Sequence, residues 1–255
     1  MGNVRDIEEL KASHTPSAIR RRLKRETHHS YLRDFVYGGI DGAVTTFAVV
    51  SGVAGAGLSS GVVIVLGLAN LAGDGFSMAA SNYLGSKADL QLLDQARRTE
   101  EQHIRDHPAG EREEIRQILA AKGFRGVALE NAVETYTADE KLWVDTMLQE
   151  ELGLSLDRPN PIKAAAITFA AFVVIGILPL LSFLVDFAVA AGFSRPFLCS
   201  TLLTGAAFFI VGAIKSRFVN DRWYWSGLET LMVGSAAALL AFVVGMALRG
   251  VVDTH

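Results

Sequence analysis

The sequence predicts an all-α membrane protein, with five transmembrane helices and a three-helix cytoplasmic domain inserted between spans two and three. Half of its 255 residues are hydrophobic and the mean hydropathy is +0.29, yet 20% of the residues are charged. This mixture indicates a bilayer part joined to a polar part. The single cysteine, Cys199, provides neither a disulfide framework nor a zinc site.

The first 33 residues form a polar, basic tail that contains "RRRLKRETHHS" from Arg20 to Ser30. No apolar segment with a small-residue cleavage site follows the start, so we expect no removable signal peptide. The basic cluster is compatible with nucleic-acid binding, but we favour an anchor on anionic membrane lipid. The net charge of −3 also argues against a nucleic-acid partner. We interpret His28 and His29 as a chance pair.

Five segments have the length and composition of membrane spans, which need about 20 residues with few charges. A two-residue link joins the first two spans as a tight hairpin. The predicted domains are a tail (1–33), spans one and two (34–86), a cytoplasmic metal-binding domain (87–163) and spans three to five (164–255). The spans are Phe35–Leu58, Gly61–Leu84, Ala164–Val185, Phe197–Ile214 and Thr230–Leu248.

The basic residues predict the orientation of these spans. With a cytoplasmic N-terminus, the inner segments 1–34, 87–163 and 215–228 hold 22 of the 24 Lys and Arg residues. Positive charge is enriched on the cytoplasmic side of membrane proteins. We therefore expect an integral membrane protein with its C-terminus outside the cytoplasm.

The inserted segment 87–163 has helical character. The first of its helices continues from span two, because no helix-breaking residue intervenes. Pro108 suits the first turn of a second helix, after Asp106 or His107, and Gly123 suits its end. A third helix is predicted over Ala128–Leu152, with a packing face formed by Val133, Tyr136, Leu142, Trp143 and Met147.

Two aspartates interrupt otherwise apolar spans. Asp41 lies in span one, with Thr45 one turn later, and Asp74 lies in span two. Each carboxylate costs about 2.5–3.5 kcal/mol to insert at the centre of a helix. Polar side chains can simply join helices by hydrogen bonds, but an ionised carboxylate needs a cation, a donor cluster or a proton.

Asp74 belongs to a polar stripe on span two. Asn70, Asp74, Met78 and Asn82 follow at steps of four, so they share one broad face of a helix. A carboxylate that alternates between a proton and a cation is the minimal part for proton-coupled cation transport. A thioether favours Fe²⁺ over Mg²⁺ or Ca²⁺, with Mn²⁺ and Co²⁺ as further candidates.

The stretches around Asp41 and Asp74, with a third near residue 150, resemble the vacuolar iron transporter family and its bacterial members. "GGIDGAVTTFAVVSGVAGAG" contains the D-G motif of that family's first span. "GDGFSMAASNYLGSKAD" contains its S-M-x-x-x-x-Y-L motif, and "TMLQEELGL" resembles the segment before its third span. The resemblance covers about residues 33–250.

The resemblance implies a homodimer with an ion path at the dimer interface, and export of Fe²⁺ from the cytoplasm in exchange for protons. The matching membrane residues are Asp41 and Met78. Well-known members carry a glutamate where this chain has Asn70, and Asp74 one turn later is a candidate replacement. The expected location is a bacterial plasma membrane, and metal is substrate here rather than cofactor.

The family's cytoplasmic domain binds metal through glutamates spaced E-x2-E-x7-E-x2-E, followed by a Met and Glu cluster. His103 replaces one of these glutamates, and imidazole is a sound Fe²⁺ ligand. Read without the family, the carboxylates are typical of a solvated helix face. Glu101, His107 and Glu113 are possible substitutes. The implied ligands are Glu100, His103, Glu111, Glu114, Met147 and Glu151.

Two other functions are compatible with parts of the sequence. Glu100-x-x-His103 is half of a di-iron carboxylate signature, which would suit a ferroxidase. The only other histidine with a glutamate three residues before it is His29, in the basic tail, where we interpret it as part of a chance pair. We therefore predict that the chain is not an enzyme. A membrane-bound metal sensor or storage protein would leave the intramembrane aspartates unexplained.

Overall fold

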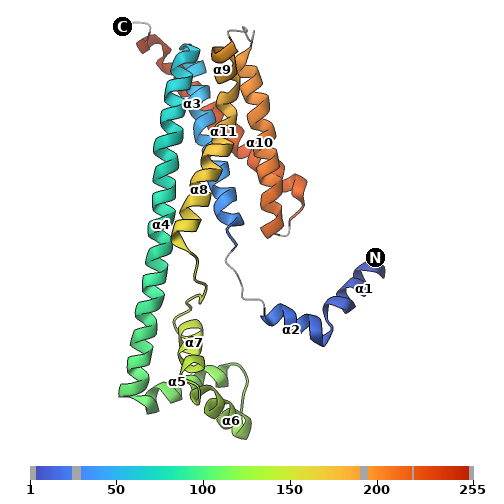
Figure 1. Cartoon of the computed structure of the whole chain (residues 1–255), viewed down its shortest axis with the longest axis vertical. Coiled ribbons are helices and arrows are strands. Elements are labelled where there is room, and N and C mark those ends of the chain that lie inside the picture. The colour runs from blue at the N-terminus through green and yellow to red at the C-terminus, as the bar shows by residue number, and fades with distance from the viewer. Residues whose placement is uncertain (1–3, 25–29, 190–194, 220, 253–255) are drawn as a thin grey trace. The chain divides into compact units, whose positions relative to one another are not determined.

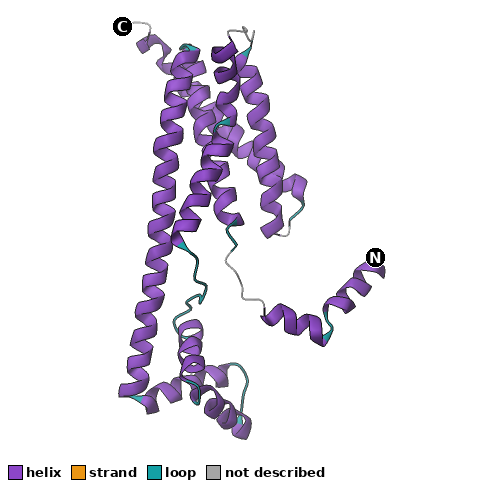
Figure 2. Cartoon of the chain, in the orientation of Figure 1, coloured by secondary structure: helices purple, strands orange, loops and turns teal. Residues whose placement is uncertain are grey.

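The computed structural model describes residues 4–24, 30–189, 195–219 and 221–252, and every regular element in these ranges is a helix (Figures 1 and 2). His28 and His29 lie outside the described residues. The helices are α1 (Val4–Ser13), α2 (Pro16–Lys24), α3 (Leu32–Ala56), α4 (Ser60–Asp106), α5 (Pro108–Ala121), α6 (Gly126–Thr137), α7 (Glu140–Glu150), α8 (Pro161–Gly176), α9 (Leu178–Val189), α10 (Pro196–Val219) and α11 (Trp223–Val252).

The chain divides into two compact units. We call residues 31–89 and 160–255 the apolar unit, and residues 1–30 and 90–159 the polar unit. The long helix α4 contributes its first part to the apolar unit and its last part to the polar unit. Its continuity confirms that the helix of the second span extends beyond the apolar run.

Among the described residues, four helices, α3, α4, α10 and α11, are long and apolar enough to cross a membrane. A fifth crossing is possible if α8 and α9, which are bent by 53° at their junction, act together. The segment predicted as the third span, Ala164–Val185, is thus covered by two helices rather than one. Pro179 has no N–H to continue the ladder, and its ring would clash with the carbonyl of Ile175 in a straight helix.

Helix α3 is the centre of the apolar unit and packs most extensively on α8 and α11. The core consists of side chains such as Phe47, Val50, Phe172 and Phe208. Close approach of α3 and α8 requires glycine at position 42, where a Cβ atom would overlap the carbonyl oxygen of Phe172. Gly42 therefore allows the close helix packing that small residues permit in membrane proteins.

The polar unit has its own apolar core, formed by α5, α6, α7 and the last part of α4. Ile115, Leu119, Val133, Trp143 and Met147 are buried together. Helix α5 begins at Pro108 after His107, and Gly123 follows its end with a φ of 101°. Both boundaries agree with the prediction.

The predicted helix over Ala128–Leu152 is in fact two helices. Helix α6 ends at Thr137 and α7 begins at Glu140. The side chain of Asp139 accepts a hydrogen bond from the backbone N–H of Leu142 at 3.1 Å, so it caps the start of α7. This cap starts a separate helix, and Leu142, which we expected to pack, lies at the surface with 39% of its area exposed.

Candidate metal-binding sites

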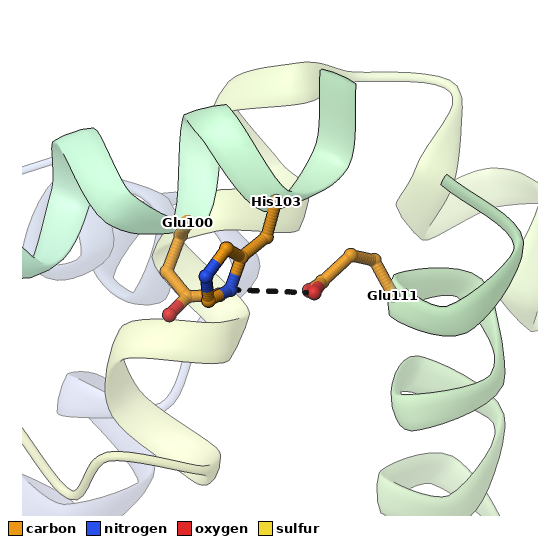
Figure 3. Close-up of side chains that lie close together, drawn as sticks. All are labelled: Glu100, His103 and Glu111. Atoms are coloured by element: carbon orange, nitrogen blue, oxygen red, sulfur yellow. Dashed lines mark ion pairs between the residues drawn. The ribbon is translucent and has the colours of Figure 1, made fainter. Parts of the chain in front are cut away.

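Three predicted ligands meet at the junction of α4 and α5. Glu100 and His103 project from the last turns of α4, and Glu111 projects from the first turn of α5 (Figure 3). One ligand atom of each lies within 4.8 Å of the others, and His103 Nδ1 is 3.5 Å from Glu111 Oε1. We call these three residues the triad.

The local fold explains how residues eleven positions apart in sequence converge. Glu100 and His103 are three residues apart, so they share one face of α4. His107 alone separates α4 from α5, with φ −141° and ψ 59°, and this single non-helical residue turns the chain. Its ring packs over Gly110, where a Cβ atom would overlap it. His107 is therefore occupied in shaping the turn.

The triad carboxylates are buried and incompletely satisfied. Glu100 is 4% exposed and Glu111 is 6% exposed. One oxygen of each, Oε2, receives no hydrogen bond from the residues that the structure describes. Buried carboxylate oxygens without a donor are costly unless a proton or a cation satisfies them.

Burial and mutual repulsion alter the acidity of this cluster. Burial, followed by the charges of Glu114 and Glu100, raises the pKa of Glu111 to about 7, and His103 opposes the rise. The pKa of Glu100 is raised mainly by burial. The pKa of Glu151 is raised by burial and then by the charges of Glu114 and Glu100. A cation placed among these groups would relieve the repulsion.

The other three predicted ligands differ in position. Glu114 and Glu151 have exposed side chains that interact electrostatically with the triad, but they are not part of the group within ligand distance. Met147 is fully buried and packs in the apolar core of the polar unit. The structure thus brings together three of the six residues, with two acidic residues nearby.

The triad suits a small divalent cation by charge, donor type and distance. Two ligand atoms on opposite sides of an ion, with bonds of about 2.1 Å, lie about 4.2 Å apart. Only a slight contraction of the triad would reach that geometry. Two carboxylates and one imidazole match the preferences of Fe²⁺ and related ions. Within the described residues this cluster contains one histidine, so the second Glu-x-x-His of a di-iron centre is not supplied.

In the apolar unit, predicted polar groups of α3 and α4 also come together. Asn70 Nδ2 donates a hydrogen bond to Thr45 Oγ1 at 3.3 Å, and this bond joins the two helices. Thr45 Oγ1 donates in turn to the backbone oxygen of Asp41 at 2.9 Å. The carboxylates of Asp41 and Asp74 lie near enough to interact electrostatically.

The remaining members of the stripe on α4 have different surroundings. Asp74 lies on an exposed face of the helix, and Met78 is half-buried against the apolar core. Asn82 Nδ2 donates to Asp34 Oδ1 at 2.9 Å and to Thr168 Oγ1 at 2.7 Å. Asn82 therefore joins α3, α4 and α8. Sequence reasoning missed Asp34, although an acid at the start of an apolar helix was a visible signal.

These features define an integral membrane protein with carboxylates inside its apolar helices and a metal-type ligand cluster in a polar unit. A model of the VIT family matches residues 32–246, and the chain belongs to that family. It is 33% identical to a vacuolar iron transporter of Toxoplasma gondii, over 99% of this chain and 87% of that protein.

Relatives of similar identity occur in other organisms. A vacuolar iron transporter of Plasmodium berghei is 31% identical, over 96% of this chain and 92% of the relative. Vacuolar iron transporter 2 of Oryza sativa subsp. japonica is 31% identical, over 89% of this chain and 92% of the relative. All three are named as transporters, which agrees with the prediction that the chain is not an enzyme.

Proposed function

We propose that this protein exports Fe²⁺ from the cytoplasm in exchange for protons. The observation that carries the proposal is the pair of interacting carboxylates, Asp41 and Asp74, on adjacent apolar helices. The names of its relatives support iron as the ion. Mn²⁺ and Co²⁺ remain candidate substrates because the same oxygen, nitrogen and sulfur donors bind them.

Proton coupling follows from competition for the same oxygens. A carboxylate in an apolar environment is stable when it is protonated or bound to a cation, but not when it is bare. Arrival of protons from the far side therefore displaces metal from Asp41 and Asp74. Thr45 and Asn70 add oxygen donors beside this pair, and Met78 adds a thioether one turn from Asp74.

In this proposal the triad collects metal in the cytoplasm before transport. Its raised carboxylate pKa values mean that it exchanges protons for metal near neutral pH. Glu114 and Glu151 increase the local negative potential that attracts cations. The distribution of Lys and Arg supports a cytoplasmic position for this unit, and a bacterial plasma membrane is the location expected from the sequence.

We further propose that the working form is a homodimer. Asp74 is exposed on the described part of α4, and the exposed apolar side chains Leu66 and Leu84 lie on the neighbouring part of the same helix side. A carboxylate on an exposed face of a membrane helix would meet lipid in an isolated chain, which is unfavourable. A second copy packed on this face would enclose Asp74 and supply a matching carboxylate.

Flux of Fe²⁺ into proteoliposomes with an imposed pH gradient tests the proposal. We expect gradient-dependent uptake by the wild type and only the background of empty liposomes for Asp41→Asn. Asp186→Asn is the matched control, because it makes the same change in another apolar helix, α9, and should retain uptake. Wild-type protein that binds Fe²⁺ without transporting it would instead favour a sensor or storage role.

A further inference from the structure

A pocket of about 760 Å³ lies at one end of the apolar unit, and neither Asp41 nor a triad residue lines it. It is formed where α3 begins, α10 ends and α11 begins, and these three helix ends lie together in Figure 1. Leu32, Phe209, Ile210 and Trp223 supply much of its apolar wall. Its volume is typical of pockets that hold small organic ligands.

One cation, Arg217, lines this pocket. Its side chain makes no hydrogen bond or ion pair with the residues that the structure describes. Two neighbouring cations are already engaged: Lys215 Nζ lies 2.6 Å from Glu229 Oε2, and Arg222 Nη1 donates to the hydroxyl of Tyr224 at 3.1 Å. The pocket therefore combines an apolar wall with one available positive charge.

The aromatic residues beside the pocket indicate its depth in a membrane. Trp223, Tyr224 and Trp225 are 59%, 41% and 54% exposed. Tryptophan and tyrosine concentrate where the hydrocarbon layer meets the headgroups. At the same end of the unit, Arg33 stacks over Tyr37 with 5.4 Å from Cζ to the ring centre. The pocket thus opens at headgroup depth, where a bound molecule can be apolar at one end and charged at the other.

We propose that this pocket binds an anionic glycerophospholipid. Its phosphate would pair with Arg217 and an acyl chain would lie along the wall formed by Phe209 and Ile210. A free phosphate ion would leave that wall exposed to water, so the apolar lining favours a lipid. A zwitterionic lipid carries its own cation and gains less from Arg217.

Native mass spectrometry of the full chain in detergent tests this assignment. The protein is titrated with phosphatidylglycerol or with phosphatidylcholine of the same acyl chains. We expect the wild type to favour phosphatidylglycerol, and Arg217→Gln to weaken its binding about fivefold while binding of phosphatidylcholine weakens much less. Arg217→Lys should restore most of the preference, because it restores the charge.

Two further variants separate this pocket from general surface charge. Arg222→Gln removes a cation at the same end that does not line the pocket, and it should leave the preference intact. Ala213→Leu extends a side chain into the pocket and should weaken binding of both lipids. Size-exclusion chromatography checks that each variant is folded.

Three outcomes would overturn the assignment. The first is an equal affinity of the wild type for the two lipids. The second is an equal loss in Arg217→Gln and Arg222→Gln, which would indicate general attraction to the surface. The third is complete displacement of phosphatidylglycerol by inorganic phosphate at comparable concentration, which would identify a phosphate site instead. None of these readouts depends on transport.

Discussion

Acidification should release metal from the triad far more steeply than it would from ordinary carboxylates. Metal and proton compete for Glu111, whose pKa is about 7 in the folded protein without metal. The apparent affinity should therefore fall about tenfold from pH 8 to pH 6, and about 90-fold from pH 8 to pH 5. A glutamate with the ordinary pKa of 4.5 would lose only about 1.3-fold over the wider range.

Equilibrium dialysis of Fe²⁺ under anaerobic conditions measures this dependence. Asp41→Asn in the background removes the proposed intramembrane site, so that binding reports the triad. Glu111→Gln should weaken binding at pH 8 and flatten its pH dependence. His103→Gln should weaken binding while the contribution of Glu111 to the slope persists, which separates the imidazole from the carboxylate.

Glu134→Gln is the matched control, because Glu134 is an exposed glutamate on α6 of the same unit. It should bind like the parent protein at every pH. An affinity that changes less than about twofold between pH 8 and pH 6 would refute the reasoning, since a ligand with a pKa of about 7 cannot escape proton competition there. Identical behaviour of Glu111→Gln and Glu134→Gln would refute it as well.

Three further predictions concern stability. Without metal, Glu111 keeps its proton between pH 4.5 and 7 in the folded state but loses it in the unfolded state, so the free energy of unfolding falls as pH rises through that range. Glu111→Gln should therefore stabilise the protein at pH 8 by up to about 3 kcal/mol, measured as a higher melting temperature. Gly245→Leu should prevent folding, at a cost of at least about 3 kcal/mol, because the added Cβ would overlap the carbonyl oxygen of Gly52. Its control is Gly250→Leu, which has open space around the added side chain and should give a normal size-exclusion profile. Asp139→Ala should lose the cap of α7 and about 1 kcal/mol in denaturant unfolding, without loss of metal at saturating concentration.

The sequence predicted the helical class and the polar groups of the membrane helices because their signals are local. An aspartate such as Asp41 stands out in any apolar run of about 20 residues. The breaks between helices were harder to predict. Pro179 and Asp139 each mark a break between two helices. A search for long apolar or helical runs averages over many residues and so hides the effect of a single one. Their effect is stereochemical and depends on one missing or one added hydrogen bond.

The candidate triad was predicted in part for the same reason. Glu100 and His103 share a face by helix periodicity alone. Their approach to Glu111 depends on the backbone angles of His107, which spacing does not determine. Asn82 shows the larger difficulty, because its partner Thr168 is 86 residues away in sequence. Pairing of that kind is set by helix packing and was not accessible without a structure.

The central position of α3 has a consequence for how the protein is made. Its main packing partners, α8 and α11, are synthesised late. At about 5–20 residues per second, the roughly 100 residues between the end of α3 and the start of α8 take about 5–20 s to translate. During that interval a glycine-rich helix with an intramembrane carboxylate has only α4 beside it. Substitutions that weaken the packing of α3 on α4, such as loss of the hydrogen bond between Asn70 and Thr45, should therefore reduce the yield of inserted protein. This yield should fall more than the stability of the protein that has already folded.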